Sequence, residues 1–232
     1  MRALLLAAGL GTRLRPLTND IPKCLVPIRG KPLLGYWLDL LLGSDIERVL
    51  INTHYLPDKV RKFVDASGYR NRITLAHEEV LLGTGGTVLR NRAFFGNEPF
   101  IVAHADNLTR FDAREFVAQH RNRRPGIQMT MMTFDSDAPE TCGIVEVDPA
   151  GVVVRFHEKV PNPPGTRANA AVYIFEPIVV DYIMSLGKEI VDLSTEVIPH
   201  FLGRIVSFHN AGYHRDIGTM NSLRLAEQEF CP

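Results

Sequence analysis

The chain opens with a run of small and aliphatic residues, 3–8, that leads directly into Gly9-Leu-Gly-Thr-Arg13-Leu-Arg15-Pro16. An unbroken apolar run that ends at glycines is typical of a buried strand followed by a tight turn. Such a turn can point several backbone N–H groups into one concavity that suits an anion, and arginine side chains add contacts to phosphate oxygens. The segment therefore predicts a phosphate-binding loop, with a nucleotide as the expected ligand.

Three other interpretations of this segment are weaker. A basic start before a short apolar run resembles a secretory signal, but no small-residue cleavage site follows. The dinucleotide fingerprint G-x-G-x-x-G needs a third glycine where Leu14 stands, and Pro16 restricts a helix there. A Walker A loop would need Gly-Lys-Ser/Thr, which does not follow. The pattern thus indicates phosphates without indicating NAD or a P-loop.

Composition limits the class of protein. With 232 residues the chain can bury a sizeable core, and we expect a single domain over residues 1–232. The 26 basic and 26 acidic residues balance, which argues against nucleic-acid or membrane-surface partners. Cys24, Cys142 and Cys231 are scattered without a C-x-x-C pair, which predicts free thiols, no zinc site and a cytoplasmic location.

Strand-like and helix-like segments alternate through the first half. We expect strands over 3–8, 48–53, 73–76 and 100–103, and helices over 32–42, 57–64, from Gly83 onward and from Asp112 to about His120. This alternation favours a largely parallel sheet with helices on both faces. After Pro125 we expect short strands over 129–133, 143–147, 152–156 and 170–175, with a hairpin connection over 148–151.

Two aspartates follow strand-like segments and are candidate metal ligands. Asp106 comes just after the strand over 100–103, and Asp216 lies in His214-Arg-Asp-Ile-Gly-Thr219. In an open parallel sheet, ligands gather beyond the carboxyl ends of the strands, where carboxylates can hold Mg²⁺ against phosphate oxygens. Each Asp alone could equally cap a turn. Together with the phosphate-binding loop, the pair predicts a two-carboxylate metal site.

Taken together, these segments resemble the motifs of the sugar-1-phosphate nucleotidylyltransferases. The motifs are most similar to those of the mannose-1-phosphate guanylyltransferases. The resemblance covers nearly the whole chain in the order of that family's motifs. The matching segments are Leu6 to Thr18, Ile21-Pro-Lys-Cys-Leu-Val-Pro27, His77-Glu-Glu-Val-Leu-Leu-Gly-Thr-Gly-Gly86, Asp106-Asn-Leu, Phe156-His-Glu-Lys159, Asn169-Ala-Ala-Val-Tyr-Ile-Phe175 and Asp216-Ile-Gly-Thr219. The resemblance implies an α/β, Rossmann-like three-layer nucleotidyltransferase fold with a mainly parallel mixed central sheet.

The resemblance also implies a reaction, in which a sugar-1-phosphate oxygen attacks the α-phosphorus of an NTP in line and pyrophosphate leaves, with Mg²⁺ as cofactor. Arg13 would hold the leaving phosphates, Lys23 would neutralise charge at the α-phosphate, and Asp106 and Asp216 would hold Mg²⁺. Lys159 would bind the sugar phosphate. The implied nucleotide-binding residues are Ala8, Gly9, Leu10, Gly11, Thr12, Glu78, Glu79, Gly83 and Thr84, and the implied sugar-binding residues are Gly143, Glu158, Lys159 and Asn169. The sequence is also compatible with a homo-oligomer.

The identity of the base rests on Glu78 and Glu79. Guanine offers two adjacent donors that one carboxylate can accept, whereas uracil and thymine offer one donor between acceptors. The glutamate pair therefore favours GTP, and the resemblance to mannose-1-phosphate guanylyltransferases implies mannose-1-phosphate or a related sugar. A solvated surface pair is the alternative, and short UTP- or dTTP-using transferases carry similar segments.

Four positions depart from the family pattern. Ala105 and Ala171 replace glycines, His214 replaces a tryptophan, and Leu81 replaces a proline. These departures keep open a silent nucleotide- or sugar-binding regulator, although the retained acidic and basic residues favour an enzyme. The resemblance also leads us to expect a form without the C-terminal β-helix of longer relatives, since no hexapeptide repeats follow.

Overall fold

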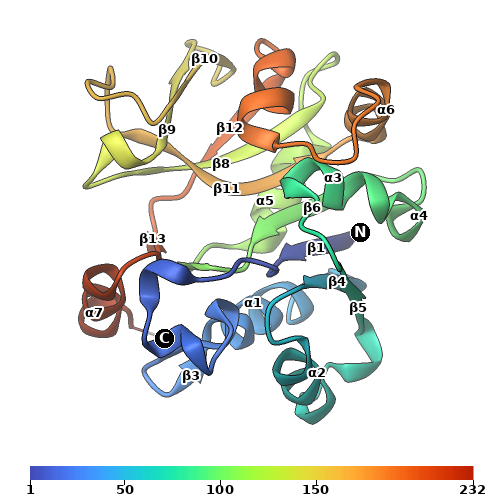
Figure 1. The fold of residues 1–232 in the computed structure, drawn as a ribbon. Helices are drawn as coiled ribbons and strands as arrows, with labels where there is room; N and C mark the ends of the chain where they lie inside the picture. Colours follow the sequence, from blue (N-terminus) through green and yellow to red (C-terminus); the bar gives the residue numbers. More distant parts are fainter. Residues whose placement is uncertain (232) are drawn as a thin grey trace. The chain divides into compact units, whose positions relative to one another are not determined.

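The computed structural model describes residues 1–231 (Figure 1), and they form two compact units. The first unit combines Met1–Leu81, Ala103–Ala113 and the chain from Gly212 on, and the second combines Leu82–Val102 and Arg114–Ala211. Neither unit is continuous in sequence. The expectation of one domain over residues 1–232 stays a prediction.

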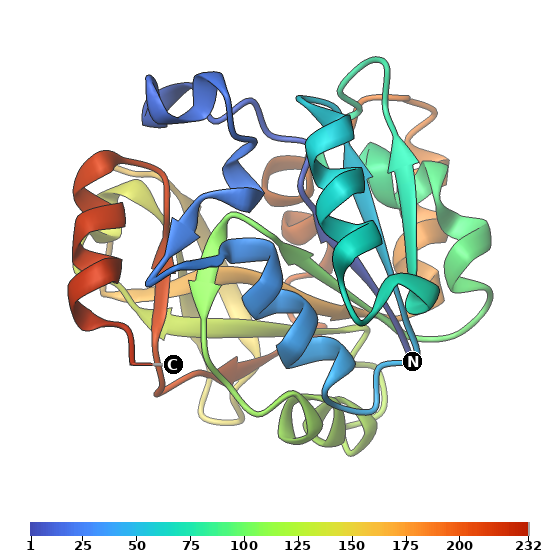
Figure 2. The same cartoon turned by 90° about the horizontal axis from the view of Figure 1, so that it is seen from below.

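A parallel three-stranded arrangement organises the first unit. Strand β1 (Arg2–Leu6) pairs with β4 (Arg48–Thr53), and β4 pairs with β5 (Ile73–His77), so the three carboxyl ends lie at one edge. Helices α1 (Leu33–Leu42) and α2 (Pro57–Ala66) lie on the same face of these strands, as Figure 2 shows. This parallel order with covering helices is the arrangement that the alternating sequence pattern predicts.

The other elements of the first unit form a second core beside the loop that follows β1. It contains β2 (Pro27–Ile28), β3 (Lys31–Pro32), β7 (Asn107–Thr109), β13 (His214–Asp216) and α7 (Met220–Glu229). Their buried apolar side chains form one cluster with the loop. The cluster contains Leu14, Val26, Ile28, Leu33, Leu108, Ile217, Ala226 and Phe230. Segments that are far apart in the sequence thus bury Leu14, Val26 and Ile28 in one cluster.

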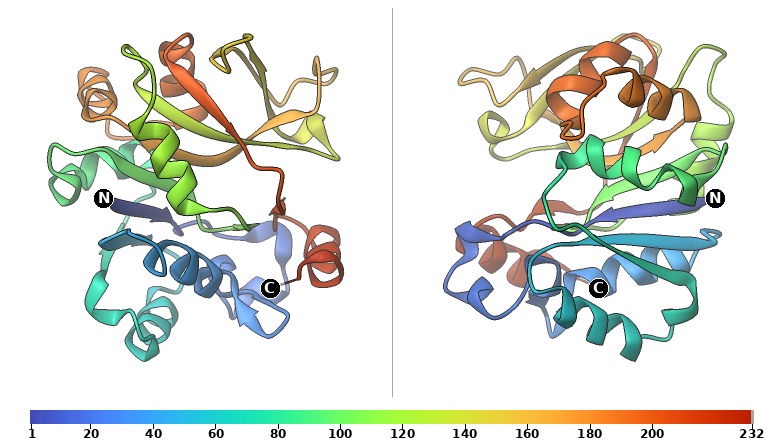
Figure 3. Two further views of the ribbon diagram at one scale, coloured as in Figure 1. Left: turned by 180° about the vertical axis from the view of Figure 1, so that it is seen from behind. Right: turned by 45° about the vertical axis from the view of Figure 1, so that its right-hand side comes forward.

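The second unit is built on antiparallel strands. Strand β11 (Arg167–Phe175) pairs with β8 (Met129–Asp135) and β9 (Gly143–Val147), and β9 pairs with β10 (Val153–Glu158). Strand β12 (Ile205–His209) runs parallel to β8. Helix α5 (Ala113–Arg121) packs on β8 and β12, which Figure 3 shows from behind. An edge-to-face contact between Phe116 and Phe208 joins this helix to β12, with ring centroids 5.2 Å apart.

The remaining elements of the second unit are mainly helical. They are α3 (Gly83–Arg90), α4 (Arg92–Phe95), α6 (Pro177–Ser185), a π-helical turn (Leu193–Val197) and a 3₁₀ turn (Ile198–Phe201). Strand β6 (Phe100–His104) begins in the second unit and ends in the first. No helix within residues 1–231 is both long enough and apolar enough to cross a bilayer.

Most elements expected from the sequence form, and β4 and β9 have the predicted bounds. The Asp148 hairpin connection also forms, because the Asp148 side chain accepts from the backbone N–H groups of Ala150 and Val152, both at 2.9 Å. The prediction that the first strand reaches residue 8 is wrong, since β1 ends at Leu6. The Ala7 N–H donates instead to the Asn52 side chain at 2.7 Å, which takes it out of the ladder.

A β-bulge interrupts the pairing of β11 with β8 between Asn169 and Tyr173. Within it Ala171 has a positive φ of 53°, the left-handed region that favours glycine. The Asn169 side chain accepts from the Ala171 N–H at 3.0 Å and so holds this conformation. Backbone geometry therefore explains why the resembled family has glycine at this position.

A buried histidine links α5 to the sheet of the second unit. Thr130 donates its hydroxyl proton to His120 Nδ1 at 2.8 Å, and His120 Nε2–H donates to Glu176 Oε1 at 3.0 Å, which fits the neutral ring. Burial is the largest influence and, with the Arg123 charge, lowers the pKa of His120 to about 4. Glu176 opposes this shift only in part.

We predict that stability falls as the pH is lowered from about 6.5 to about 4. In this window the unfolded chain takes up a proton that the folded His120 ring does not, so protonation favours unfolding, by on the order of 2 kcal/mol at the lower end. Urea unfolding of His120→Gln should show a smaller loss over this window than the wild type. His200→Gln, at an exposed histidine, is the control and should keep the wild-type slope; equal slopes for all three proteins would contradict the prediction.

We predict that Ala171→Gly stabilises the protein by about 1 kcal/mol, because glycine adopts a positive φ without the Cβ clash. Ala170→Gly is the matched control. Ala170 is fully buried in the same strand, so removal of its methyl group should destabilise the protein. Thermal unfolding measures both, and destabilisation by Ala171→Gly would contradict the strain argument.

Candidate functional site

The loop after β1 is the segment that the sequence predicts to bind phosphate. Gly11 has a φ of 63°, and Thr18 donates its hydroxyl to the Gly11 carbonyl at 2.7 Å. A Cβ on Gly11 would lie 3.1 Å from side-chain carbons of Lys23 and Thr18, so glycine is also required by packing. Within residues 1–231 the N–H groups of Gly9, Leu10 and Gly11 donate to no protein acceptor. These donors are available to an anion.

A lysine ammonium joins the two predicted carboxylates in the first unit. Lys23 Nζ lies 2.7 Å from Asp106 Oδ2 and 3.2 Å from Asp216 Oδ1. The lysine side chain is 8% exposed, whereas those of Asp106 and Asp216 are 35% and 55% exposed. The carboxylates therefore face solvent on one side while they compensate a buried cation on the other.

Backbone pairing brings the two aspartates together. Strands β7 and β13 are antiparallel, with Asp216 opposite Asn107. The Ile217 N–H donates to the Asp106 carbonyl at 3.1 Å. Lys23 comes from a short 3₁₀ turn, Lys23–Leu25, that follows Pro22. The association of these three residues is therefore set by strand register as well as by charge.

Arg13 extends the cluster toward solvent. Its Nη2 lies 3.9 Å from Asp216 Oδ2, and its side chain is 69% exposed, so the contact is loose. Gly218 makes this approach feasible, since a Cβ there would lie 2.6 Å from Asp216 Oδ2 and 2.9 Å from Arg13 Nη2. Sequence reasoning did not select Gly218, although it lies in the Asp216-Ile-Gly-Thr219 motif.

Burial and nearby charges shift the pKa values of three groups in or beside the cluster. Partial burial acts to raise the pKa of Asp106, but Lys23 and His104 outweigh it and hold that pKa below its usual range. Burial lowers the pKa of His214 to about 3, so this imidazole is neutral at physiological pH. Burial also raises the pKa of Cys24 to about 12, which keeps the thiol protonated and unreactive.

The two carboxylates fit a divalent cation. Their inner oxygens already surround one cationic group, and their exposure leaves room for a second cation on the solvent side. Among residues 1–231, no group of three or more His, Cys, Asp or Glu side chains is placed to hold a metal ion. A cation here would thus need oxygens from water or a bound phosphate, the coordination that Mg²⁺ favours.

The two glutamates expected to recognise the base differ in their surroundings. Glu78 is 1% exposed, and its Oε1 accepts from Asn52 Nδ2 at 3.1 Å. Glu79 is exposed, and so are the apolar side chains of Val80 and Leu81 that follow it. Only Glu79 therefore has a carboxylate that solvent, or a ligand, can reach without rearrangement.

The predicted sugar-binding residues lie in the second unit, where Gly143 pairs with Glu158 across β9 and β10. A Cβ on Gly143 would lie 2.5 Å from the Phe156 ring and 2.8 Å from Glu158 Oε2. Packing against the aromatic ring therefore requires this glycine. Lys159 Nζ lies 3.1 Å from Glu158 Oε1, and Lys159 has a φ of 49°. The backbone strain at Lys159 is typical of functional positions.

Asn169 is held at both ends of its amide. Its Nδ2 donates to the Tyr173 hydroxyl at 2.6 Å, and its Oδ1 accepts from the Ala171 N–H. Burial is the main cause that raises the pKa of Tyr173. Asn169 is thus a fixed element of the bulge, with one amide proton remaining for a ligand.

Gly83 and Thr84 begin α3 and pack against the segment that contains Val191. A Cβ on Gly83, whose φ is 72°, would lie 2.5 Å from the Val191 carbonyl oxygen. Thr84 Oγ1 accepts from the Leu193 N–H at 2.7 Å and donates to Asp192 Oδ2 at 3.5 Å. In this structure the glycine-rich segment holds α3 close to a neighbouring loop.

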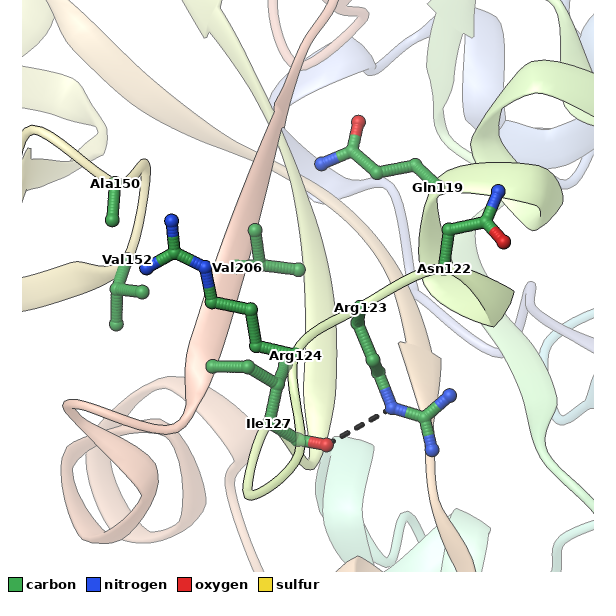
Figure 4. A pocket seen from close by; sticks show the side chains of 8 residues that line it. All are labelled: Gln119, Asn122, Arg123, Arg124, Ile127, Ala150, Val152 and Val206. Atoms are coloured by element: carbon green, nitrogen blue, oxygen red, sulfur yellow. Dashed lines mark hydrogen bonds between the residues drawn. The ribbon is translucent and has the colours of Figure 1, made fainter.

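A surface pocket in the second unit is lined by none of the predicted residues (Figure 4). It is lined by Gln119, Asn122, Arg123, Arg124, Ile127, Ala150, Val152 and Val206. The Arg123 guanidinium is held by hydrogen bonds within the protein. Its Nε–H donates to the Ile127 carbonyl at 3.0 Å, and its Nη1–H donates to the His120 carbonyl at 2.8 Å. The pocket contains none of the side chains that could carry out the expected chemistry.

Residues 2–231 match the nucleotidyl transferase family. The chain belongs to this family. Two solved structures support the fold. A putative glucose-1-phosphate thymidylyltransferase from Bacillus anthracis, in complex with a sucrose, has a TM-score of 0.88 at 24% identity and covers 98% of this chain and 94% of its own. HddC from Yersinia pseudotuberculosis, complexed with GMP-PN, has a TM-score of 0.81 at 25% identity and covers 99% of both chains. The expected α/β nucleotidyltransferase fold is confirmed.

Curated relatives in the nucleotidyl transferase family differ in the nucleotide they use. The chain is 34% identical to a mannose-1-phosphate guanylyltransferase of Mycobacterium tuberculosis, over 94% of this chain and 61% of the relative. It is 30% identical to a UTP–glucose-1-phosphate uridylyltransferase of Synechocystis, over 90% of this chain and 57% of the relative. The chain thus spans about 60% of the length of these relatives.

We predict that Gly83→Ala destabilises the protein by about 3 kcal/mol or more, because a positive φ and a backbone clash with Val191 act together. Gly187→Ala, just after the end of α6, is the control for strain alone: its φ is 64°, and nothing lies within 4 Å of the added Cβ. That variant should lose only about 1 kcal/mol. Urea unfolding measures both, and equal losses would show that packing at Gly83 contributes nothing.

Proposed function

We propose that the chain transfers a nucleotidyl group from an NTP to a sugar-1-phosphate, which yields an NDP-sugar and pyrophosphate. The observation that carries this proposal is the cluster of Lys23, Asp106, Asp216 and Arg13 beside a loop with unengaged N–H donors. Phosphoryl chemistry requires positioned charges more than it requires a protein nucleophile, and this cluster supplies charges of both signs.

The proposed step balances without a covalent intermediate on the protein. A phosphate oxygen of the sugar-1-phosphate forms a bond to the α-phosphorus, and the bond from that phosphorus to the bridging oxygen of the leaving group breaks. The electron pair leaves with pyrophosphate. No proton transfer to the protein is needed, because the attacking phosphate oxygen is already ionised.

The candidate site residues of the first unit each have a role in this proposal. The N–H groups of Gly9, Leu10 and Gly11 bind phosphate oxygens, and Arg13 reaches the leaving pyrophosphate from its exposed position. Lys23 neutralises charge at the α-phosphate. Asp106 and Asp216 would hold Mg²⁺, which when bound neutralises negative charge on the phosphates. In the second unit, Lys159 would bind the sugar phosphate, while Glu158 and Asn169 would bind sugar hydroxyls.

We further propose GTP and mannose-1-phosphate, or a related sugar, as the substrates. The support is the exposed Glu79 carboxylate, which suits the two adjacent donors of guanine, and the 34% identity to a mannose-1-phosphate guanylyltransferase. A relative that uses UTP makes uracil the second candidate base, with glucose-1-phosphate as the sugar substrate.

A matrix of GTP, UTP, dTTP, ATP and CTP against several sugar-1-phosphates, scored by Mg²⁺-dependent pyrophosphate release, tests the proposal. We expect turnover with one preferred pair, with GTP and mannose-1-phosphate first. Nucleotide binding without pyrophosphate release from any pair would instead favour a regulator.

Asp106→Asn should lower kcat by about 10²-fold or more, because it removes a negative charge that would hold Mg²⁺ against the phosphates and that compensates the Lys23 ammonium. Asp58→Asn, at an exposed position in α2, is the control and should leave turnover unchanged. Near-normal turnover by Asp106→Asn would refute the role proposed for this carboxylate.

A further inference from the structure

A buried hydrogen bond from helix α1 reaches the backbone beside the two aspartates of the first unit. Trp37 is the one tryptophan in the sequence, and it is 2% exposed. Its indole Nε1–H donates to the Asn107 carbonyl at 2.8 Å. Asn107 follows Asp106 directly and lies opposite Asp216 in the pairing of β7 with β13. The acceptor of this bond is thus the backbone position that adjoins both carboxylates.

The register of β7 and β13 explains why the Asn107 carbonyl faces α1. In an antiparallel ladder, pairs of residues that exchange both backbone hydrogen bonds alternate with pairs that exchange none. The Ile217 N–H donates to the Asp106 carbonyl at 3.1 Å, so Asp106 belongs to a bonded position. Asn107 is the next position along, and its carbonyl therefore points away from β13. Trp37 meets it on that side.

With this bond, the backbone is held at each residue from Ala105 to Asn107. The Ala105 N–H donates to the Leu6 carbonyl at 3.0 Å, which ties the segment to the end of β1. The Asp106 carbonyl accepts from β13, and the Asn107 carbonyl accepts from α1. The Asp106 side chain is 35% exposed, so packing around it is loose. The direction of its carboxylate is therefore set by this backbone and by the Lys23 ammonium.

The surroundings of Trp37 separate the role of its nitrogen from the role of its ring. The ring lies on the buried face of α1 and makes an edge-to-face contact with Phe111, with centroids 6.5 Å apart. A phenylalanine could make apolar contacts of the same kind. The buried indole N–H also needs an acceptor, and a buried carbonyl that loses its donor is destabilised. The N–H is thus the part of the side chain that connects α1 to the aspartates.

We propose that Trp37 is a positioning residue for a divalent-cation site at Asp106 and Asp216, and that it acts through the Asn107 carbonyl. The inference rests on the proposed function, because it takes these two carboxylates as cation ligands. Buried behind the backbone, Trp37 would not itself contact the cation. Its loss therefore weakens cation binding and leaves the rate at saturating cation nearly unchanged.

Removing the indole N–H tests the inference. Mn²⁺ is the probe, because it accepts the same oxygen ligands as Mg²⁺ and the paramagnetic resonance of the free ion gives a dissociation constant without nucleotide or turnover. Trp37→Phe should raise this constant about 5-fold, the loss expected for one buried hydrogen bond. In pyrophosphate release, the Mg²⁺ concentration for half-maximal rate should rise by the same factor, with kcat changed less than about 2-fold.

Tyr36→Phe is the matched control. Tyr36 lies next to Trp37 in α1, and its hydroxyl donates to the Ile28 carbonyl at 2.9 Å. The variant thus removes a bond of the same kind from the same helix, but one that does not reach the aspartates. It should stay within about 2-fold of wild type in Mn²⁺ affinity and in Mg²⁺ dependence.

The indole signal gives a second measurement that needs neither turnover nor a change at Trp37. Because the sequence has one tryptophan, a ¹⁵N-correlated spectrum contains one indole N–H signal. Mg²⁺ should shift this signal until the site is saturated, whereas NaCl at equal ionic strength should not. Asp106→Asn should abolish the shift. A tryptophan that only filled the core would not respond to the cation.

An isosteric replacement decides the question if Trp37→Phe does not fold. β-(3-Benzothienyl)alanine at position 37 keeps the bicyclic shape but has sulfur in place of the N–H, and it should weaken Mn²⁺ binding to the same extent. Wild-type Mn²⁺ affinity in this protein, or in a folded Trp37→Phe, would overturn the inference. An indole signal that does not respond to Mg²⁺ would also overturn it, and so would a wild-type chain that binds no Mn²⁺.

The inference and the proposed function can fail separately. A chain that binds Mn²⁺ but releases no pyrophosphate from any substrate pair would refute the proposed reaction, while the effect of Trp37→Phe on Mn²⁺ affinity would still decide the positioning role. A chain that releases pyrophosphate, but whose Mn²⁺ affinity is the same with and without the indole N–H, would keep the proposed function and refute the inference.

Discussion

The contact of Lys23 with Asp106 and Asp216 is the interaction on which the first unit depends. It connects positions separated by 83 and 193 residues along the chain. A buried ammonium is costly unless anionic groups compensate it, and two partly exposed carboxylates do so here. Removing either carboxylate would leave the buried ammonium with one negatively charged partner instead of two. The same charges that stabilise the fold are therefore the charges available for phosphate chemistry.

Local strain and close packing accompany the candidate residues in both units. Lys159 and Ala171 adopt positive φ values beside Glu158 and Asn169, and Gly218 permits a side-chain approach that a Cβ would block. Non-glycine residues hold such conformations only where the surrounding structure fixes them. In the second unit, the Asn169 hydrogen bonds to Ala171 and Tyr173 provide that restraint. Rigidity at these positions keeps polar groups oriented before any ligand arrives.

The sequence allowed the α/β class, the opening strand and loop, and the pairing of Asp106 with Asp216 to be predicted, because each depends on a local pattern or on a motif. It did not reveal the role of Gly218, which depends on contacts with Arg13 and Asp216. It also treated Glu78 and Glu79 alike, although one is buried and the other exposed. Two adjacent glutamates on an irregular segment cannot be told apart by residue type or by periodicity. Their burial differs because of contacts with other parts of the chain, which only the tertiary structure shows. The roles of the sugar-binding residues stay predictions.

The discontinuous make-up of the first unit has a consequence for how the protein forms during synthesis. Its strands β1, β4 and β5 are translated early, but β13 and α7, which complete its second core, come from the chain after Gly212. Lys23 therefore emerges from the ribosome long before Asp216 has been synthesised. Because chains emerge at about 5–20 residues per second, this lysine spends roughly ten seconds or more without its second carboxylate. Until β13 and α7 have been synthesised, the second core of the first unit is incomplete and its apolar side chains are open to aggregation.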